Sequence, residues 1–290
     1  MKKVLICGLG AIGLTVANQI KNFCELKILV DKERLIKYQN KKPILNNIEQ
    51  NFTYILPENN FTPDLIIIST KSYDLNSAID NIKNFISSKT VIISLLNGIS
   101  SEETIKKAYP HITVLKSYFI GHSAVRINNE VTQDGIGEIV IENNDALISI
   151  LNEIKLNYTI ATNINYAMWL KFTLNLFSNQ TSAILNLTFG EMKNNQRFIE
   201  FAKKIIKEVE SIAKQKNIQG LENLEADALY ALSKMCDEGK TSMLQDVLAN
   251  KKTEVDIFAG EIIKLGKELG VATPYNQVLY DLIKIKEYSL

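Results

Sequence analysis

The pattern of hydrophobic and polar positions divides the chain into two parts. In the first part, short β-rich apolar runs alternate with segments of helical periodicity, which is typical of a parallel sheet with crossover helices. We expect a helix over about residues 11–21 and five strands, over residues 3–7, 26–30, 65–69, 91–95 and 113–116. This part is therefore predicted to be an α/β domain.

Residues 117–143 interrupt this alternation with a more polar pattern. The runs 123–126 and 137–141 flank a stretch that contains Asn128, Asn129 and Gly135, and we expect both runs to be antiparallel strands that close the edge of the sheet. Residues 158–161 are predicted to add one more short strand.

From about residue 163 onward, the apolar positions follow helical spacing only. The spacing predicts helices over about residues 164–187, 198–213, 224–235 and 255–269, the last ended by Gly270 with Pro274 beyond it. We therefore predict an α/β domain over residues 1–162 and an all-helical domain over residues 163–290. The boundary rests on this change of period alone.

Charge and cysteine content exclude several classes of protein. Lys and Arg number 33 against 32 Asp and Glu, and the basic residues are scattered, so we expect no binding to nucleic acid or to a membrane. Three cysteines without a Cys-x-x-Cys pair fit a reducing cytosol, so we predict a cytoplasmic protein. The sequence does not fix the oligomeric state, and a homodimer is among the states it allows.

A glycine motif joins the first predicted strand to the first predicted helix. It consists of Gly8, Leu9, Gly10, Ala11, Ile12 and Gly13. In such a motif the first glycine allows the tight turn, the second lets a pyrophosphate approach the backbone, and the third lets the helix pack on the strand. The N–H groups at the helix start can then bind phosphate. The motif predicts a Rossmann-like dinucleotide site, and a plain glycine-containing turn is the alternative.

Asp31 follows the second predicted strand, 18 residues after Gly13. An acid near this spacing hydrogen-bonds the adenosine ribose and repels a 2′-phosphate, which favours NAD(H) over NADP(H). Two alternatives stay open at this point. Lys32 and Arg34 could instead clamp a 2′-phosphate, and Asp31 could be the N-cap of the next helix.

Two polar residues follow neighbouring strands, where open α/β sheets bind ligands. Lys71 comes after the strand at 65–69, and Asn97 comes after the strand at 91–95. Both are candidate ligand-binding residues. A solvated loop lysine and an Asn97-Gly98 turn are the alternatives.

Lys171, Asn175 and Asn179 lie four residues apart on one face of a predicted helix that is otherwise apolar. A buried polar group without a partner costs about 1–3 kcal/mol, so this row either pairs internally or faces a cleft that holds a ligand. Together with the glycine motif, the row suggests a reductase, because hydride attack on a carbonyl produces an alkoxide that needs a nearby proton donor. Both histidines, His111 and His122, are expected to be structural.

A lysine can donate that proton if burial lowers its pKa from about 10.4, so Lys171 is the candidate general acid. A second polar cluster lies at 241–256. There, the hydroxyl of Ser242 could bind a substrate carboxylate. Glu254 and Asp256 flank the start of the next predicted helix, where an acid is stabilising in any case, and their order does not say which one turns inward.

These motifs together resemble the ketopantoate reductase (2-dehydropantoate 2-reductase) family, and they span nearly the whole chain in the family's order. The match includes the glycine motif, Lys71, Asn97-Gly98, the row that begins at Lys171, and the segment 241–246 with Glu254 twelve residues beyond Ser242. The row and the Ser-Met-x-Gln-Asp segment with its spaced Glu are the specific parts.

The resemblance implies that Lys171 is the general acid and that Glu254 helps to hold the reacting hydroxyl. It implies further that Asn175, Asn179 and Ser242 bind the substrate, a small 2-keto acid, and that Asn97 and Lys71 lie between the cofactor ribose and the substrate. The implied reaction reduces 2-dehydropantoate to (R)-pantoate, for pantothenate and coenzyme A synthesis. The family typically uses NADP(H), often with a basic residue where this chain has Asp31, so the preferred nucleotide stays open.

Two other functions remain under consideration. An NAD-dependent D-2-hydroxyacid dehydrogenase that acts on another branched or aromatic 2-keto acid would share this architecture, and Asp31 supports it. A non-catalytic dinucleotide sensor with a helical interaction domain is less favoured, because a sensor has no reason to keep Lys171 and Glu254 in one cleft.

Overall fold

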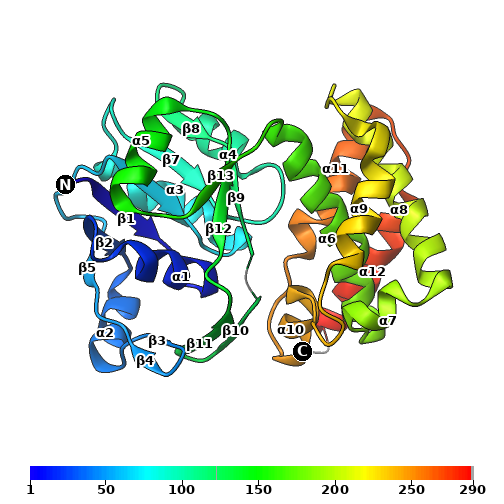
Figure 1. The fold of residues 1–290 in the computed structure, drawn as a ribbon, viewed down its shortest axis with the longest axis horizontal. Coiled ribbons are helices and arrows are strands. Elements are labelled where there is room, and N and C mark those ends of the chain that lie inside the picture. The colour runs from blue at the N-terminus through cyan, green and yellow to red at the C-terminus, as the bar shows by residue number, and fades with distance from the viewer. Residues whose placement is uncertain (122, 289–290) are drawn as a thin grey trace. The chain divides into compact units, whose positions relative to one another are not determined.

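The computed structural model describes residues 1–121 and 123–288, and its chain divides into two compact units (Figure 1). The first unit is Met1–Ile164 and the second is Asn165–Leu290. His122, one of the two histidines considered above, lies outside the described residues.

A six-stranded parallel sheet forms the centre of the first unit, in the order β5-β2-β1-β6-β7-β8. Five of its strands confirm the prediction, namely β1 (Lys3–Cys7), β2 (Glu25–Leu29), β6 (Leu65–Ile68), β7 (Val91–Ser94) and β8 (Thr113–Leu115). The edge strand β5 (Thr53–Ile55) has only three residues and was not predicted.

Helices cover both faces of this sheet. They are α1 (Ala11–Ile20), α2 (Lys32–Asn40), α3 (Leu75–Ile82), α4 (Ser101–Ala108) and α5 (Asp145–Ile154). Alternate residues of one strand enter different cores: Leu65 and Ile67 pack with α1 and α5, and Ile66 and Ile68 pack with α3. This two-sided burial explains the continuous apolar sequence of β6 and confirms the α/β fold class.

Two small sheets accompany the central one. The first contains β10 (Ser123–Ile127), β11 (Glu130–Asp134), β3 (Ile44–Leu45) and β4 (Ile48–Glu49), and the second contains β13 (Tyr158–Ile160), β12 (Glu138–Ile141) and β9 (Ser117–Ile120).

The predicted closure of the central sheet by the runs 123–126 and 137–141 was therefore wrong. β10 pairs with β11, β12 pairs with β9, and the central sheet ends at β8 among the described residues. The reason is that the polar stretch between the two runs itself forms a strand. Asn128, with φ 54°, occupies the left-handed turn position that joins β10 to β11.

Among its described residues, the second unit contains helices and no strand, as predicted. Its helices are α6 (Ile164–Leu185), α7 (Phe189–Lys193), α8 (Gln196–Gln215), α9 (Leu224–Ser233), α10 (Ser242–Leu248), α11 (Ala259–Leu269) and α12 (Pro274–Tyr288). Gly270 ends α11 with φ 69°, which confirms the predicted C-cap. No helix among the described residues is both long enough and apolar enough to cross a membrane.

The helix predicted over residues 255–269 was wrong in its first turn. A short 3₁₀ helix, η4 (Val255–Ile257), is separated from α11 by Phe258, whose φ of −100° and ψ of −97° are not helical. Phe258 is buried and stacks on Phe172 of α6 with ring centroids 6.2 Å apart, so tertiary packing accompanies this break.

Glu102, in the first turn of α4, is a buried carboxyl group within a small serine cluster. The Ser101 hydroxyl oxygen lies 3.1 Å from Glu102 Oε2 and 2.9 Å from the hydroxyl oxygen of Ser94, at the end of β7. Burial raises the pKa of Glu102 to about 7, against the opposing effect of its hydrogen bonds.

This raised pKa predicts a pH-dependent stability. A carboxyl group whose pKa is higher in the folded state than in the unfolded state contributes stability at low pH, and this contribution is lost between about pH 4.5 and 7. Glu102→Gln should remove this pH dependence. The free energy of unfolding of the variant should therefore exceed that of the parent protein by about 1–3 kcal/mol between pH 5 and 8. Urea unfolding at several pH values measures this difference, and parallel pH profiles would contradict the prediction.

Candidate active site

The glycine motif lies at the point in the central sheet where the chain order reverses. From β1 the chain builds outward through β2 and β5, and it then returns to the other side of β1 to form β6, β7 and β8. Ligands of open α/β sheets bind at such a switch point, outside the carboxyl ends of the strands. The motif follows the carboxyl end of β1 directly, and Gly10 is the N-cap residue of α1.

The three glycines meet different steric constraints. A Cβ atom on Gly8, whose φ is +99°, would lie 2.7 Å from the Ser69 carbonyl carbon, and one on Gly13 would lie 2.1 Å from the Gly8 oxygen. A Cβ atom on Gly10 would have Ser69 O as its nearest neighbour, at 3.9 Å. The packing of the protein thus requires Gly8 and Gly13 but leaves room at Gly10. A pyrophosphate seated against the backbone accounts for Gly10, so the loop fits a dinucleotide.

Two residues that the sequence analysis did not identify contact this loop. The Ser69 hydroxyl donates a hydrogen bond to the Gly8 oxygen at 2.8 Å, and Arg126 of β10 donates one from Nη1 to the Leu9 oxygen at 2.5 Å. Ser69 could have been noticed from its place at the end of a strand. No signal pointed to Arg126, because it belongs to the hairpin whose pairing was predicted incorrectly.

Lys71 and Asn97 follow two adjacent parallel strands, β6 and β7, and both are partly buried. Because β1 also pairs in parallel with β6, these residues lie at the same sheet edge as the glycine motif. Gly98 has a φ of +97°, in the left-handed region that favours glycine, within a bend of the chain.

Asp31 is the N-cap of α2, which confirms one of the alternatives considered for it. Its Oδ1 accepts a hydrogen bond from the Arg34 backbone N–H at 2.6 Å. The Arg34 guanidinium lies 3.6 Å from Asp31 Oδ2 and 3.8 Å from Asp74 Oδ2, so two carboxylates share its charge. Lys32 is exposed to solvent.

In the second unit, α6 includes Lys171, Asn175 and Asn179, so its regular geometry places all three on one face. Lys171 and Asn175 are partly buried, and Asn179 is 4% exposed. Burial lowers the pKa of Lys171 from 10.5 to about 8, although the negative charge of Glu254 acts in the opposite direction.

The structure decides which acid of the 254–256 segment turns inward. Glu254 is 7% exposed and interacts electrostatically with Lys171, whereas Asp256 is exposed and forms an ion pair with Lys284 at 2.9 Å. Glu254 occupies the N-cap position of η4 without a side-chain capping bond, so capping does not explain its burial.

Ser242 belongs to a third segment that contacts α6. The hydroxyl groups of Ser182 and Thr241 lie 2.8 Å apart, and Ser182 is three residues beyond Asn179 on α6. Thr241 caps α10 by accepting a hydrogen bond from Leu244 N at 3.2 Å, and Ser242 is the exposed first residue of that helix. The second unit therefore brings the polar row of α6, the start of α10 and Glu254 into one region.

His111 lies exposed in a turn of the first unit, away from these residues in the sequence. Across the part of the chain that the structure describes, no group of three or more His, Cys, Asp or Glu residues could hold a metal ion.

Comparison with known proteins gives a family match in both units of the chain. Residues 4–146 match the family model described as ketopantoate reductase PanE/ApbA, and residues 163–287 match the one described as ketopantoate reductase PanE/ApbA C terminal. The chain belongs to the ketopantoate reductase family. It is thus an oxidoreductase of a nicotinamide-dependent family, and the resemblance read from its motifs is confirmed.

Individual relatives match nearly the whole length of this family member. A 2-dehydropantoate 2-reductase of Pyrococcus horikoshii is 31% identical, over 98% of this chain and 97% of its own. A D-mandelate dehydrogenase structure with NADH and anilino(oxo)acetate is 25% identical, with a TM-score of 0.88 and 99% of each chain covered. A PanE/ApbA family ketopantoate reductase from Ralstonia eutropha has the same fold, with 22% identity, a TM-score of 0.85 and 99% of each chain covered.

The glycine geometry predicts opposite effects of two similar substitutions. Gly10→Ala should fold as the parent protein does but should lose dinucleotide affinity by about tenfold or more, because its methyl group enters the space of the pyrophosphate. Gly13→Ala should instead lower the thermal stability, because its methyl group would overlap the Gly8 carbonyl. Calorimetric titration with NADH and NADPH, together with thermal unfolding, separates the two effects. Unchanged affinity in Gly10→Ala would contradict this assignment of the loop.

Proposed function

We propose that the protein is a 2-dehydropantoate 2-reductase, which reduces ketopantoate to (R)-pantoate with a nicotinamide dinucleotide and so serves pantothenate and coenzyme A synthesis. The observation that carries the proposal is a lysine of lowered pKa beside a buried glutamate, on a polar face of α6, in a chain that matches the family over both halves. In this proposal residues 1–162 bind the dinucleotide and residues 163–290 bind the keto acid.

Lys171 is the general acid of the proposed reaction. A reduced nicotinamide dinucleotide held by the glycine motif would supply the hydride for the carbonyl carbon of the substrate. The protonated Nζ of Lys171 donates a hydrogen bond to the carbonyl oxygen and transfers its proton as the C–O bond becomes single, which yields the hydroxyl group. The neutral amine then regains a proton from water. A pKa of about 8 makes the transfer easier than from an ordinary lysine, while most of the lysine stays charged at neutral pH.

The neighbouring side chains hold the substrate in this proposal. Glu254 accepts a hydrogen bond from the reacting hydroxyl and, by its charge, keeps Lys171 protonated. Asn175, Asn179 and Ser242 bind the other polar groups of the keto acid. In the first unit, Lys71 and Asn97 lie between the cofactor ribose and the substrate, and the backbone of the glycine motif binds the pyrophosphate.

Steady-state oxidation of NADH and NADPH with a panel of 2-keto acids tests the proposal. We expect the highest kcat/KM with ketopantoate. A higher value with phenylglyoxylate or another bulky keto acid would assign the protein to the D-2-hydroxyacid dehydrogenases, an alternative suggested by the likeness to D-mandelate dehydrogenase. Dinucleotide binding without turnover of any keto acid would favour a sensor.

Lys171→Ala should lower kcat by about 10²–10⁴-fold, the usual contribution of a general acid, with dinucleotide affinity unchanged. In the parent protein, kcat for reduction should fall as the pH rises through about 8, because the donor loses its proton there. Lys203→Ala on α8, which removes a lysine that pairs with Glu225, is the control and should keep full activity. Near-normal turnover in Lys171→Ala would exclude Lys171 as the acid.

We further propose that Asp31 favours NADH, because its carboxylate would repel a 2′-phosphate and the charge of Arg34 is shared between two carboxylates. Asp31→Asn keeps an N-cap side chain but removes the negative charge. It should raise the NADPH:NADH ratio of kcat/KM by about tenfold, equivalent to about 1.4 kcal/mol. Asp31→Ala should raise the ratio in the same direction and also lose the cap. An unchanged ratio in both variants would mean that Asp31 only caps α2.

A further inference from the structure

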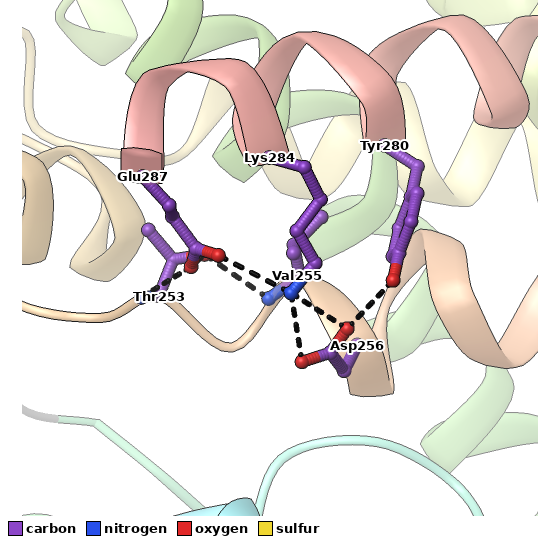
Figure 2. Close-up of polar contacts among 6 residues, drawn as sticks. All are labelled: Thr253, Val255, Asp256, Tyr280, Lys284 and Glu287. Carbon is purple, nitrogen blue, oxygen red and sulfur yellow. Dashed lines mark hydrogen bonds and ion pairs between the residues drawn. The ribbon is translucent and has the colours of Figure 1, made fainter. Parts of the chain in front are cut away.

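The C-terminal helix α12 holds the residue that precedes Glu254 in the chain (Figure 2). One carboxylate oxygen of Glu287, Oε1, accepts hydrogen bonds from the Thr253 backbone N–H at 2.8 Å and from the Thr253 hydroxyl at 2.6 Å. Hydrogen bonds to an ionised acceptor are about twice as strong as neutral ones, so this double contact fixes both the backbone and the side chain of Thr253.

The same helix holds the chain two residues beyond Glu254. The Tyr280 hydroxyl donates to Asp256 Oδ1 at 2.9 Å, and Lys284 Nζ donates to Asp256 Oδ2 at 3.0 Å. Lys284 Nζ also lies 3.2 Å from Glu287 Oε2 and therefore links the two contacts (Figure 2). The spacing of 280, 284 and 287 places all three side chains on one face of α12.

The segment that carries Glu254 has little regular structure of its own. Residues 251–254 are irregular and η4 has only three residues. Phe258 has a non-helical backbone conformation, so α11 begins only after it. The position of the Glu254 carboxylate must therefore come from contacts with other elements.

These contacts are not needed to attach α12 to the unit. Leu279 and Ile283 are buried on the helix, and its first turn is held by Glu208 of α8, which accepts from Tyr275 N at 2.8 Å and from Asn276 Nδ2 at 2.7 Å. The helix would thus remain in place if the contacts with Thr253 and Asp256 were lost. The role of the contacts with Thr253 and Asp256 can therefore be tested separately from the stability of the fold.

We propose that Tyr280, Lys284 and Glu287 are positioning residues that hold Glu254 beside Lys171 through Thr253 and Asp256. The inference rests on the proposed function, in which Glu254 binds the reacting hydroxyl. The three residues of α12 act through the backbone on both sides of Glu254 and do not touch the substrate.

Glu287→Gln and Asp256→Asn test the inference, each in the full-length protein. Each should lower kcat by about threefold to thirtyfold, while dinucleotide affinity and thermal stability stay near parental values. Glu225→Gln is the matched control, because it breaks an exposed ion pair with Lys203 at 3.0 Å in the same unit without touching residues 253–256.

A double-mutant cycle distinguishes positioning from a general loss of structure. If Glu287 acts through Glu254, Glu287→Gln should cause little further loss of kcat when Glu254 is already Gln. Additive losses would overturn the inference, as would parental kcat in both Glu287→Gln and Asp256→Asn. If Glu254→Gln itself left turnover unchanged, the proposed function of Glu254 would fail instead.

Hydrogen exchange supplies a readout that does not depend on activity. Glu287→Gln should speed the exchange of backbone amides in 250–258 and leave α6 unchanged, because α12 stays attached through Glu208 and its apolar face. Unchanged exchange in 250–258 would overturn the inference even if no substrate were turned over.

Discussion

Desolvation of Lys171 near Glu254 is the physical constraint on which the proposed chemistry depends. Removing a charged amine from water is costly, and the attraction of a nearby carboxylate only partly offsets this cost. The pKa of Lys171 falls to about 8 despite that carboxylate, so desolvation is the larger of the two effects. A lysine in this state can give up a proton near neutral pH, which the proposed reduction requires.

The candidate sites of the two units are built in different ways. In the first unit, the candidate dinucleotide site is mainly backbone, and only Gly10 among the three motif glycines lacks a steric reason within the protein. In the second unit, the candidate site consists of side chains from α6, from the start of α10 and from the segment that contains Glu254. The first candidate site depends on the backbone conformation of one loop. The second depends on contacts that fix three separate segments relative to one another.

This difference explains how much the sequence could predict. β1, the glycine motif and α1 were predictable because strand, turn and helix are adjacent in the chain, and Lys171, Asn175 and Asn179 were predictable from helical spacing alone. Residue spacing could not predict that Glu254 turns inward and Asp256 outward, and only the family resemblance pointed to Glu254. The contacts of Thr253 and Asp256 with α12 join segments 24 to 34 residues apart in the chain, which no local pattern reveals.

Other misses also came from contacts between distant segments. The β10–β11 hairpin has a polar strand whose alternation is weak in sequence, and the break at Phe258 accompanies its stacking on Phe172, far upstream. The miss of helix α12 had a local cause instead. Pro274 was interpreted only as a residue beyond the preceding helix, although proline is also favoured in the first turn of a helix.

Direct titration of Lys171 tests the central claim of this account. In cofactor-free protein with ¹⁵N-labelled lysine side chains, one Nζ resonance should titrate near pH 8 and should be absent in Lys171→Ala. Glu254→Gln should move that titration to lower pH, because the carboxylate that favours the charged amine is gone. A spectrum in which every lysine titrates above about pH 10, the ordinary range, would contradict the account.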